Sequence, residues 1–317
     1  MDSLAANLRA PYIKNRNNMR DLLCIIQMVL FMSCGDRDAL VDKSKLLGND
    51  YRLFQGTPVW NLAKAVQDEK VDEIKRIVQE EKVNVDYQEK KFGNTLLMLT
   101  VDNQHYNSCK ALLELGANPN KHDNYNGTSA IVDASNIENY KDDNTKFIKL
   151  LLEYGGNPND EETGKRQEGN TTRKTPLLAA CSDVNQFVSP IEKVKVLVDA
   201  GANVNYKNEF NDFPLAEAVM HKHYDAVLYL LQKGADYSLM LFDRAEFSEG
   251  GKKMYIADLL REDLLHLDSK KYQQKMRVVE FLKEKGIDYR KVPIPDFVIK
   301  EAKETYPKNW KEYLEKY

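Results

Sequence analysis

The sequence has no long apolar run, no paired cysteines and no excess of charge of one sign. Its longest run of mostly apolar residues, 22–32, is too short for a membrane-spanning helix, which needs about 20 residues. The four cysteines form no C-x-x-C pair, so a zinc site has little support. The 317 residues include 46 Lys+Arg against 49 Asp+Glu, which is not the basic excess of a nucleic-acid binder. This near-neutral to acidic balance instead suits a protein that binds other proteins.

Signatures of catalysis are also missing. Gly164-Lys165 lacks the upstream glycine and the following Ser or Thr of a P-loop, and no serine lies in a G-x-S-x-G motif. His221 and His223 could form a metal pair, but no third ligand stands at a recognisable spacing. The acidic pairs of the polar stretch 160–172 are better explained by solvation than by acid–base catalysis. We therefore expect no enzyme, with no catalytic residue, cofactor or metal.

The N-terminus has the order of an export signal. Residues 1–21 hold four basic side chains against two acidic ones, and the apolar run 22–32 that follows has the length of a signal-peptide core. Ser33 and Cys34 come directly after it, and this order resembles the lipobox of bacterial lipoproteins. In that family the cysteine is acylated and becomes the mature N-terminus.

This resemblance implies a division of the N-terminal part of the chain. It predicts a signal peptide of lipoprotein type at 1–33, lipidation of Cys34 and a polar tether over 34–56. It also predicts that the chain lies in the periplasm or at the outer membrane and meets the membrane only through the lipid. The alternatives are a buried helix of the first domain, or translation from Met19 in place of Met1.

A short string recurs along the rest of the chain, each time after an apolar helical stretch. It reads GANPN at 116–120, and its further copies are GGNPN (155–159), GANVN (201–205), GADYS (234–238) and the degenerate GIDYR (286–290). A turn and a short apolar helix precede each copy, as in GNTLLMLTV and KTPLLAACS. Equivalent positions recur every 33 to 47 residues, at Trp60, Thr95, Thr128, Thr175, Phe213 and Met254.

This pattern resembles the ankyrin repeat, whose period is about 33 residues. The resemblance implies an all-α, ankyrin-repeat solenoid of about six helix-turn-helix repeats with β-turn fingers over residues 57–290. Pro176 and Pro214 suit the first turn of a helix, and Thr175 before one of them suits an N-cap. The glycine that opens each string suits a left-handed helix end. The longer spacings are insertions, chiefly at 136–145, 160–172, 183–190 and 239–250.

Each repeat of a solenoid contacts mainly its neighbours, so the two ends need polar caps. We expect capping helices at 291–317, whose inward face would come from Phe297, Val298, Ala302, Trp310, Tyr313 and Leu314. Cys109 and Cys181 fall within apolar helical patterns, where a free cysteine usually acts as a small hydrophobe. A disulfide between them is the less favoured alternative.

Aromatic residues stand three positions before three of the equivalent positions, at the expected finger tips. These residues are Phe92, Tyr125 and Phe210. An exposed row of aromatic rings would be typical of a binding interface. The alternative is that the rings pack on one another and stiffen the fingers. In the fourth repeat an insertion replaces the aromatic residue, and its Arg166 and Arg173 are candidates for contacting an acidic partner.

The expected function is protein binding at the bacterial cell envelope, by a chain that is monomeric when free. The layout of lipoprotein signal and ankyrin repeats resembles the immunity proteins found beside type VI secretion lipase effectors. That resemblance implies a secreted toxin effector as the partner. A general envelope scaffold or adaptor is the alternative within the same class. An enzyme with a catalytic insertion is the alternative from another class.

Overall fold

The computed structural model describes residues 37–136, 145–164, 173–184, 188–246 and 251–317. The chain forms two compact units, residues 1–42 and 43–317. Cys34, Arg166 and the predicted signal peptide lie outside the described residues. Within the described residues, no helix combines the length and the apolar character that crossing a membrane requires.

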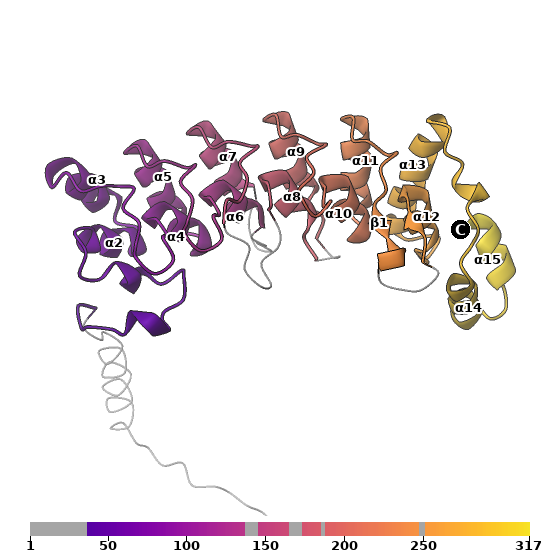
Figure 1. Cartoon of the computed structure of the whole chain (residues 1–317), viewed down its shortest axis with the longest axis horizontal. Coiled ribbons are helices and arrows are strands. Elements are labelled where there is room, and N and C mark those ends of the chain that lie inside the picture. Colours follow the sequence, from indigo (N-terminus) through magenta and orange to yellow (C-terminus); the bar gives the residue numbers. More distant parts are fainter. Residues whose placement is uncertain (1–36, 137–144, 165–172, 185–187, 247–250) are drawn as a thin grey trace, which may run out of the picture. The chain divides into compact units, whose positions relative to one another are not determined.

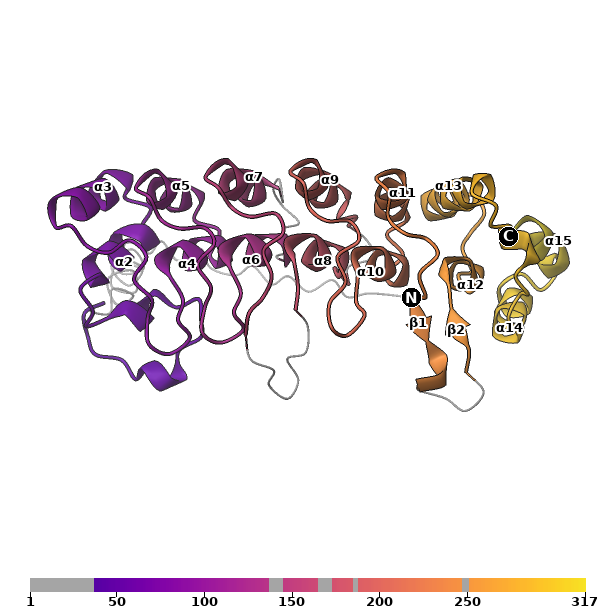
Figure 2. The same cartoon turned by 45° about the horizontal axis from the view of Figure 1, so that its top comes forward.

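The second unit contains two rows of helices, which form six consecutive pairs in the described residues (Figures 1 and 2). We call α2 (Trp60–Gln67), α4 (Leu96–Asp102), α6 (Ala130–Asn136), α8 (Pro176–Cys181), α10 (Pro214–Met220) and α12 (Ile256–Arg261) the inner row. The outer row is α3 (Val71–Glu80), α5 (Tyr106–Glu114), α7 (Lys146–Glu153), α9 (Ile191–Asp199), α11 (Tyr224–Gln232) and α13 (Lys270–Glu284). The predicted all-α solenoid of helix-turn-helix repeats is confirmed.

Short elements complete the second unit. Two 3-10 turns precede the first pair, η1 (Lys43–Lys45) and η2 (Tyr51–Phe54). The insertion before α12 forms an antiparallel hairpin of β1 (Phe242–Asp243) and β2 (Lys253–Met254), with η3 (Arg244–Glu246) beside it. After α13 follow η4 (Tyr289–Lys291), α14 (Asp296–Thr305) and α15 (Trp310–Lys316), so the expected C-terminal capping segment contains two helices.

The inner helices begin and end as their residues dictate. The hydroxyl of Thr95 accepts a hydrogen bond from the Met98 amide, and Thr175 caps α8 in the same way. Pro176 lies in the first turn of α8, where its missing N–H costs no hydrogen bond. Gly116 follows α5 with φ of +89°, a conformation that residues with a Cβ rarely adopt.

Apolar side chains between the two rows form one continuous core from Tyr51 to Tyr289. Cys109 and Cys181 are both free thiols within it, so they act as small hydrophobes. Burial raises the pKa of the Cys109 thiol to about 12 and raises that of Cys181 further. Both cysteines are therefore protonated and unreactive at neutral pH.

An asparagine ladder links consecutive repeats along the recurring strings. The last asparagine of three strings, Asn120, Asn159 and Asn205, donates from Nδ2 to the glycine carbonyl that opens the next string, over 2.9 to 3.0 Å. The Oδ1 atom of the same side chain accepts the backbone N–H of the next string, over 2.7 to 2.9 Å. Each asparagine thus fixes the next repeat through two hydrogen bonds.

Residues 43–56 differ from the predicted polar tether, because they fold onto the first repeats. Tyr51, Leu53 and Phe54 are at most 3% exposed and belong to the main core. The Tyr51 hydroxyl lies 2.9 Å from Nδ1 of His105, at the start of α5. These apolar side chains close the end of the stack over α2, so the folded part begins earlier than expected.

The C-terminal helices pack as a small separate cluster. Val298, Ala302 and Tyr313 are buried as predicted, and Trp310 and Leu314 pack partly against them. The prediction for Phe297 was wrong, since this side chain is 49% exposed. It lines a cavity with α10 and α12 residues, away from the cluster that buries the other side chains.

Polar contacts attach this cluster to the solenoid. The Tyr313 hydroxyl donates to the Leu265 carbonyl over 2.6 Å, and the Tyr272 hydroxyl donates to that of Lys316 over 2.7 Å. Lys275 is fully buried beside them, with Nζ donating to the Asp263 carbonyl over 2.9 Å. Burial lowers the pKa of Lys275 to about 7. The attachment therefore includes a buried amine whose charged form lacks the solvent that normally stabilises it.

Replacing Asn159 by Ala removes one rung of the asparagine ladder. We expect a loss of about 1–2 kcal/mol of unfolding free energy, because a carbonyl and an N–H of the next repeat lose their partner. The matched control is Asn203→Ala, which removes only a hydrogen bond within its own turn. Urea unfolding of both variants measures the difference. Equal losses in the two variants would contradict a role of the ladder in linking repeats.

Candidate functional site

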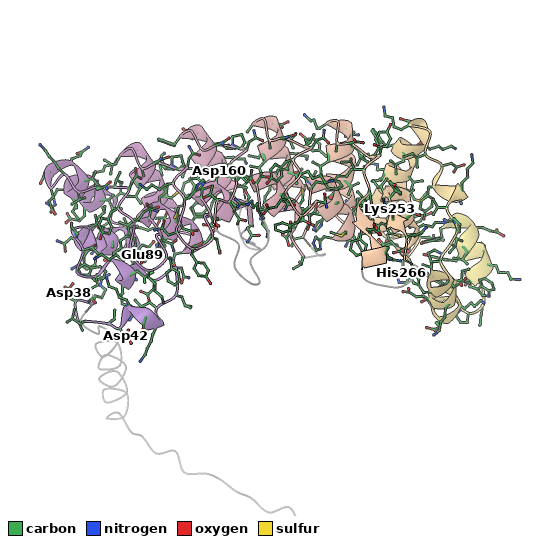
Figure 3. All side chains as sticks on the ribbon, viewed as in Figure 1. Asp38, Asp42, Glu89, Asp160, Lys253 and His266 are labelled. Atoms are coloured by element: carbon green, nitrogen blue, oxygen red, sulfur yellow. The ribbon has the colours of Figure 1, made fainter. Side chains whose placement is uncertain are left out.

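Three of the fingers between repeats, those before α4, α6 and α10, are each closed by one acceptor side chain. Oε1 of Glu89 accepts the backbone N–H groups of Phe92 and Asn94, over 2.6 and 3.2 Å (Figure 3). The Asp123 carboxylate accepts four successive N–H groups, those of residues 125 to 128, over 2.6 to 3.1 Å. Oδ1 of Asn208 accepts two in the fifth repeat. These bonds fix the direction of each finger tip.

The sequence interpretation missed these acceptors. Their signal is an acidic or amide residue five or six positions before the residue that precedes α4, α6 or α10. The residue type varies between Glu, Asp and Asn, so no repeated letter marks the position. Only the shared ability to accept backbone N–H groups joins them.

The aromatic residues at the finger tips are not equally exposed. Phe92 and Tyr125 pack edge to face, with ring centroids 5.8 Å apart and planes 83° apart. Phe92 is half-buried against the main core, and Nζ of Lys91 lies 4.6 Å from its ring centroid. Phe210 is also half-buried, whereas Tyr125 is 51% exposed. The packing of Phe92 thus agrees with a role in stiffening the finger. Tyr125 packs against Phe92 on one side and is exposed to solvent on the other.

Arg173 holds two neighbouring fingers together. Its Nη1 donates to the Glu162 carbonyl over 3.2 Å, and its Nε forms an ion pair with Glu209 over 3.3 Å. Its partners belong to consecutive inter-repeat segments, so the side chain has a structural contact on each side. The other predicted basic contact, Arg166, lies outside the described residues.

A buried carboxylate, Asp160, which is labelled in Figure 3, bonds to a histidine and a serine of the preceding finger. Nε2 of His122 lies 3.0 Å from its Oδ2, and the Ser129 hydroxyl donates to the same oxygen. Nδ1 of His122 lies 3.2 Å from the Thr163 hydroxyl, so both ring nitrogens have a partner. The Ser129 hydroxyl donates its proton to the Asp160 carboxylate. The three side chains therefore form a hydrogen-bonded link between two consecutive repeats.

The two histidines considered as a metal pair have separate structural roles. Nε2 of His223 donates to the Asp183 carbonyl over 2.7 Å, and burial lowers the pKa of this ring. Nε2 of His221 lies 3.4 Å from a carboxylate oxygen of Glu217. Among the residues that the structure describes, no three His, Cys, Asp or Glu side chains converge as metal ligands would.

Two carboxylates of the inner row, Asp102 on α4 and Asp133 on α6, have no ion-pair partner in the described part of the chain. Asp102 is exposed at the surface, but the protein atoms around it partly desolvate the carboxyl, and this and the nearby Asp123 raise its pKa to about 6. Desolvation raises the pKa of Asp133 well above its usual value, and repulsion from Asp102, Asp123 and Glu162 adds to the effect. We call Asp102 and Asp133 the inner-row carboxylates.

The chain's own residues 44–49 lie beside the finger that precedes α4 and beside the C-terminal end of α4. Nζ of Lys91, in the finger that precedes α4, donates to the carbonyls of Ser44 and Leu46, each over 2.8 Å. At the other end of the helix, Nδ2 of Asn103 donates to the Asn49 carbonyl over 2.8 Å. The segment is therefore bound through its main-chain carbonyls, by side chains of the finger before α4 and of the residue that follows α4.

Asp133→Asn should stabilise the chain at pH 7. The raised pKa means that the folded state binds a proton more tightly than the unfolded chain, so stability falls as the pH rises from about 4. The variant should unfold at a higher urea concentration at pH 7 and lose part of that pH dependence. Glu153→Gln, on an exposed position of α7, is the control and should change neither. A lower stability of Asp133→Asn at pH 7 would contradict the repulsion.

Comparison with known proteins agrees with this architecture. A family model described as ankyrin repeats (3 copies) matches residues 62–162 and 140–240, more than half of the chain. The chain is 27% identical over 142 residues to the E3 ubiquitin-protein ligase KEG of Arabidopsis thaliana. It is also 27% identical over 153 residues to a putative ankyrin repeat protein of Acanthamoeba polyphaga mimivirus. Each match covers 44% of this chain, but only 8% of the plant protein and 26% of the viral one.

A solved structure, that of the ankyrin repeat protein EF0377, aligns with 71% of this chain and 98% of its own, with a TM-score of 0.48 and 20% identity. The residues that the family model matches cover most of the five repeats from the α2–α3 pair to the α10–α11 pair. The chain therefore belongs to the ankyrin-repeat family, whose repeats generally serve as non-catalytic scaffolds that bind protein partners.

Proposed function

We propose that this chain binds one protein partner through its finger tips and inner row. The observation that carries the proposal is Tyr125, a half-exposed aromatic side chain at the tip of a finger. Its backbone N–H is fixed by Asp123, and its ring is supported from one side by Phe92. An aromatic side chain held in one place loses little entropy on binding, which is why such residues dominate protein interfaces.

The same segment offers little support for catalysis. The Ser129 hydroxyl and the His122 ring both bond to the Asp160 carboxylate, and His223 donates to a backbone carbonyl. An enzyme needs a nucleophile or base whose reactive atom is free to reach a substrate. Binding is therefore the function that these contacts favour.

We further propose that the partner is a secreted toxin effector, a lipase, and that the chain is its immunity protein at the bacterial envelope. The order of basic, apolar and Ser33-Cys34 segments supports a lipid anchor on Cys34 and a place in the periplasm or at the outer membrane. A stack of linked repeats presents a long rigid face, which suits the blocking of an active site by one partner. A general envelope adaptor uses the same fold, so the partner's identity separates the two roles.

Capture of the partner tests this proposal. The chain would be cross-linked in its own cells, isolated with an antibody raised against it, and its partners identified by mass spectrometry. Recovery of one secreted lipase in a stoichiometric complex supports the immunity role. Recovery of many resident envelope proteins supports the adaptor role, and recovery of no protein above background contradicts a stable partner.

Tyr125→Ala should weaken binding of the captured partner by roughly 1–3 kcal/mol. The change leaves the main core intact and removes only the edge-to-face pair with Phe92, so the unfolding free energy should fall by no more than about 1 kcal/mol. Phe92→Ala is the matched variant, because its half-buried ring contacts that core. We expect it to lower stability by roughly 1–3 kcal/mol. Calorimetric titration and urea unfolding measure the two effects, and unchanged affinity of Tyr125→Ala would remove this finger from the interface.

A further inference from the structure

Three segments of the chain lie side by side at the tips of the fingers before α4 and α6. We call them together the tip platform, and they are residues 44–49, 89–94 and 122–127. Nζ of Lys91 donates to the Leu46 carbonyl over 2.8 Å. Nδ2 of Asn94 donates to the Gly48 carbonyl over 3.0 Å. The segment that precedes the repeats is therefore fixed to the first of the two fingers.

The two fingers are joined to one another as well. The backbone N–H of Asn124 donates to the Phe92 carbonyl over 2.7 Å. Nε2 of Gln88 donates to the carbonyls of Gly93 and His122, each over 2.7 Å. Hydrogen bonds thus connect all three segments, and the side chains that they carry keep set positions.

Two large apolar side chains of the tip platform are exposed, Leu47 at 74% and Tyr125 at 51%. Leu47 stands between Leu46, which packs on the main core, and Gly48. A Cβ on Gly48 would lie 4.0 Å from Cδ2 of Phe92, so this segment touches the ring that also supports Tyr125. Leu47 is therefore exposed on a backbone that is held on both sides. Apolar residues exposed close together on a fixed support are typical of a binding surface.

The charge of the tip platform indicates which partner suits it. Its exposed charged residues are all lysines, namely Lys45, Lys90 and Lys91. Its two carboxylates, Glu89 and Asp123, accept backbone N–H groups of their own fingers. Acidic side chains of a partner would be attracted to these ammonium groups, and basic ones would be repelled.

We propose that the tip platform binds a segment of the partner protein in which apolar side chains are flanked by acidic ones. The apolar side chains contact Leu47 and Tyr125, and the carboxylates face Lys90 and Lys91. The proposal rests on the proposed protein-binding function. It adds residues 44–49 to the binding surface and gives the chemistry of the segment that is bound.

A short fluorescent peptide of Glu and Ser with two central leucines is the probe for this surface. We expect saturable binding to the full chain, measured by fluorescence anisotropy, that weakens as salt is added. Leu47→Ser should weaken it at least about threefold, because the apolar contact with the peptide is lost. Lys90→Glu should weaken it by at least the same factor, because a repulsive charge replaces an attractive one. Urea unfolding checks that both variants keep the stability of the parent chain, as expected at exposed positions.

The matched controls are Val184→Ser and Lys300→Glu, which make comparable changes at exposed positions after α8 and on α14. Both should leave the peptide affinity unchanged. A peptide with Ser in place of its leucines, or with Lys in place of Glu, should bind more weakly than the first. Failure of the first peptide to bind would overturn the proposal, as would equal weakening by the control variants.

The titration uses no natural partner, so its result is independent of the capture experiment. If a partner is captured but the peptide does not bind, the protein-binding function stands and the role of the tip platform is overturned. If the peptide binds but no partner is captured, the role of the tip platform is supported and the proposal of a stable partner fails.

Discussion

The architecture depends on the amide side chains that join one repeat to the next. Asn120, Asn159 and Asn205 each donate to one backbone group and accept from another in the following repeat. A helix pair this short cannot bury its apolar face alone, so stacking provides the core and the ladder fixes the register of the stack. Because the register is fixed, every finger leaves the stack at a set distance from its neighbours. The position of Tyr125 follows from this constraint.

The inner row, which is part of the proposed binding surface, also contains two charges that lower the stability of the fold. Asp102 and Asp133 lie close enough to repel one another, and desolvation raises the pKa of both carboxyls. An apolar or amide side chain at either position would suit the isolated chain better. Nearby, residues 44–49 lie beside the finger before α4 and the end of that helix, so a partner bound there also meets the chain's own segment.

Much of the fold could be predicted, because its determinants are local. Thr95, Thr175 and Gly116 act within one helix turn, and the recurring strings repeat these signals in order. Burial between distant segments could not be predicted in the same way. Tyr51 and Phe54 belong to the core only because α2 and His105 are beside them in space. The site was predicted in part: the tip position of Tyr125 was visible, but its pairing with Phe92 and the finger acceptors depend on contacts between repeats.

Hydrogen–deuterium exchange of the chain with and without its captured partner tests the central claim most directly. If fingers and inner row form the interface, amide exchange should slow in residues 89–95, in residues 123–128 and at the end of α6. The outer helices α5, α7, α9 and α11 should exchange as they do in the free chain. Protection confined to those outer helices would place the partner on the opposite row and contradict the account.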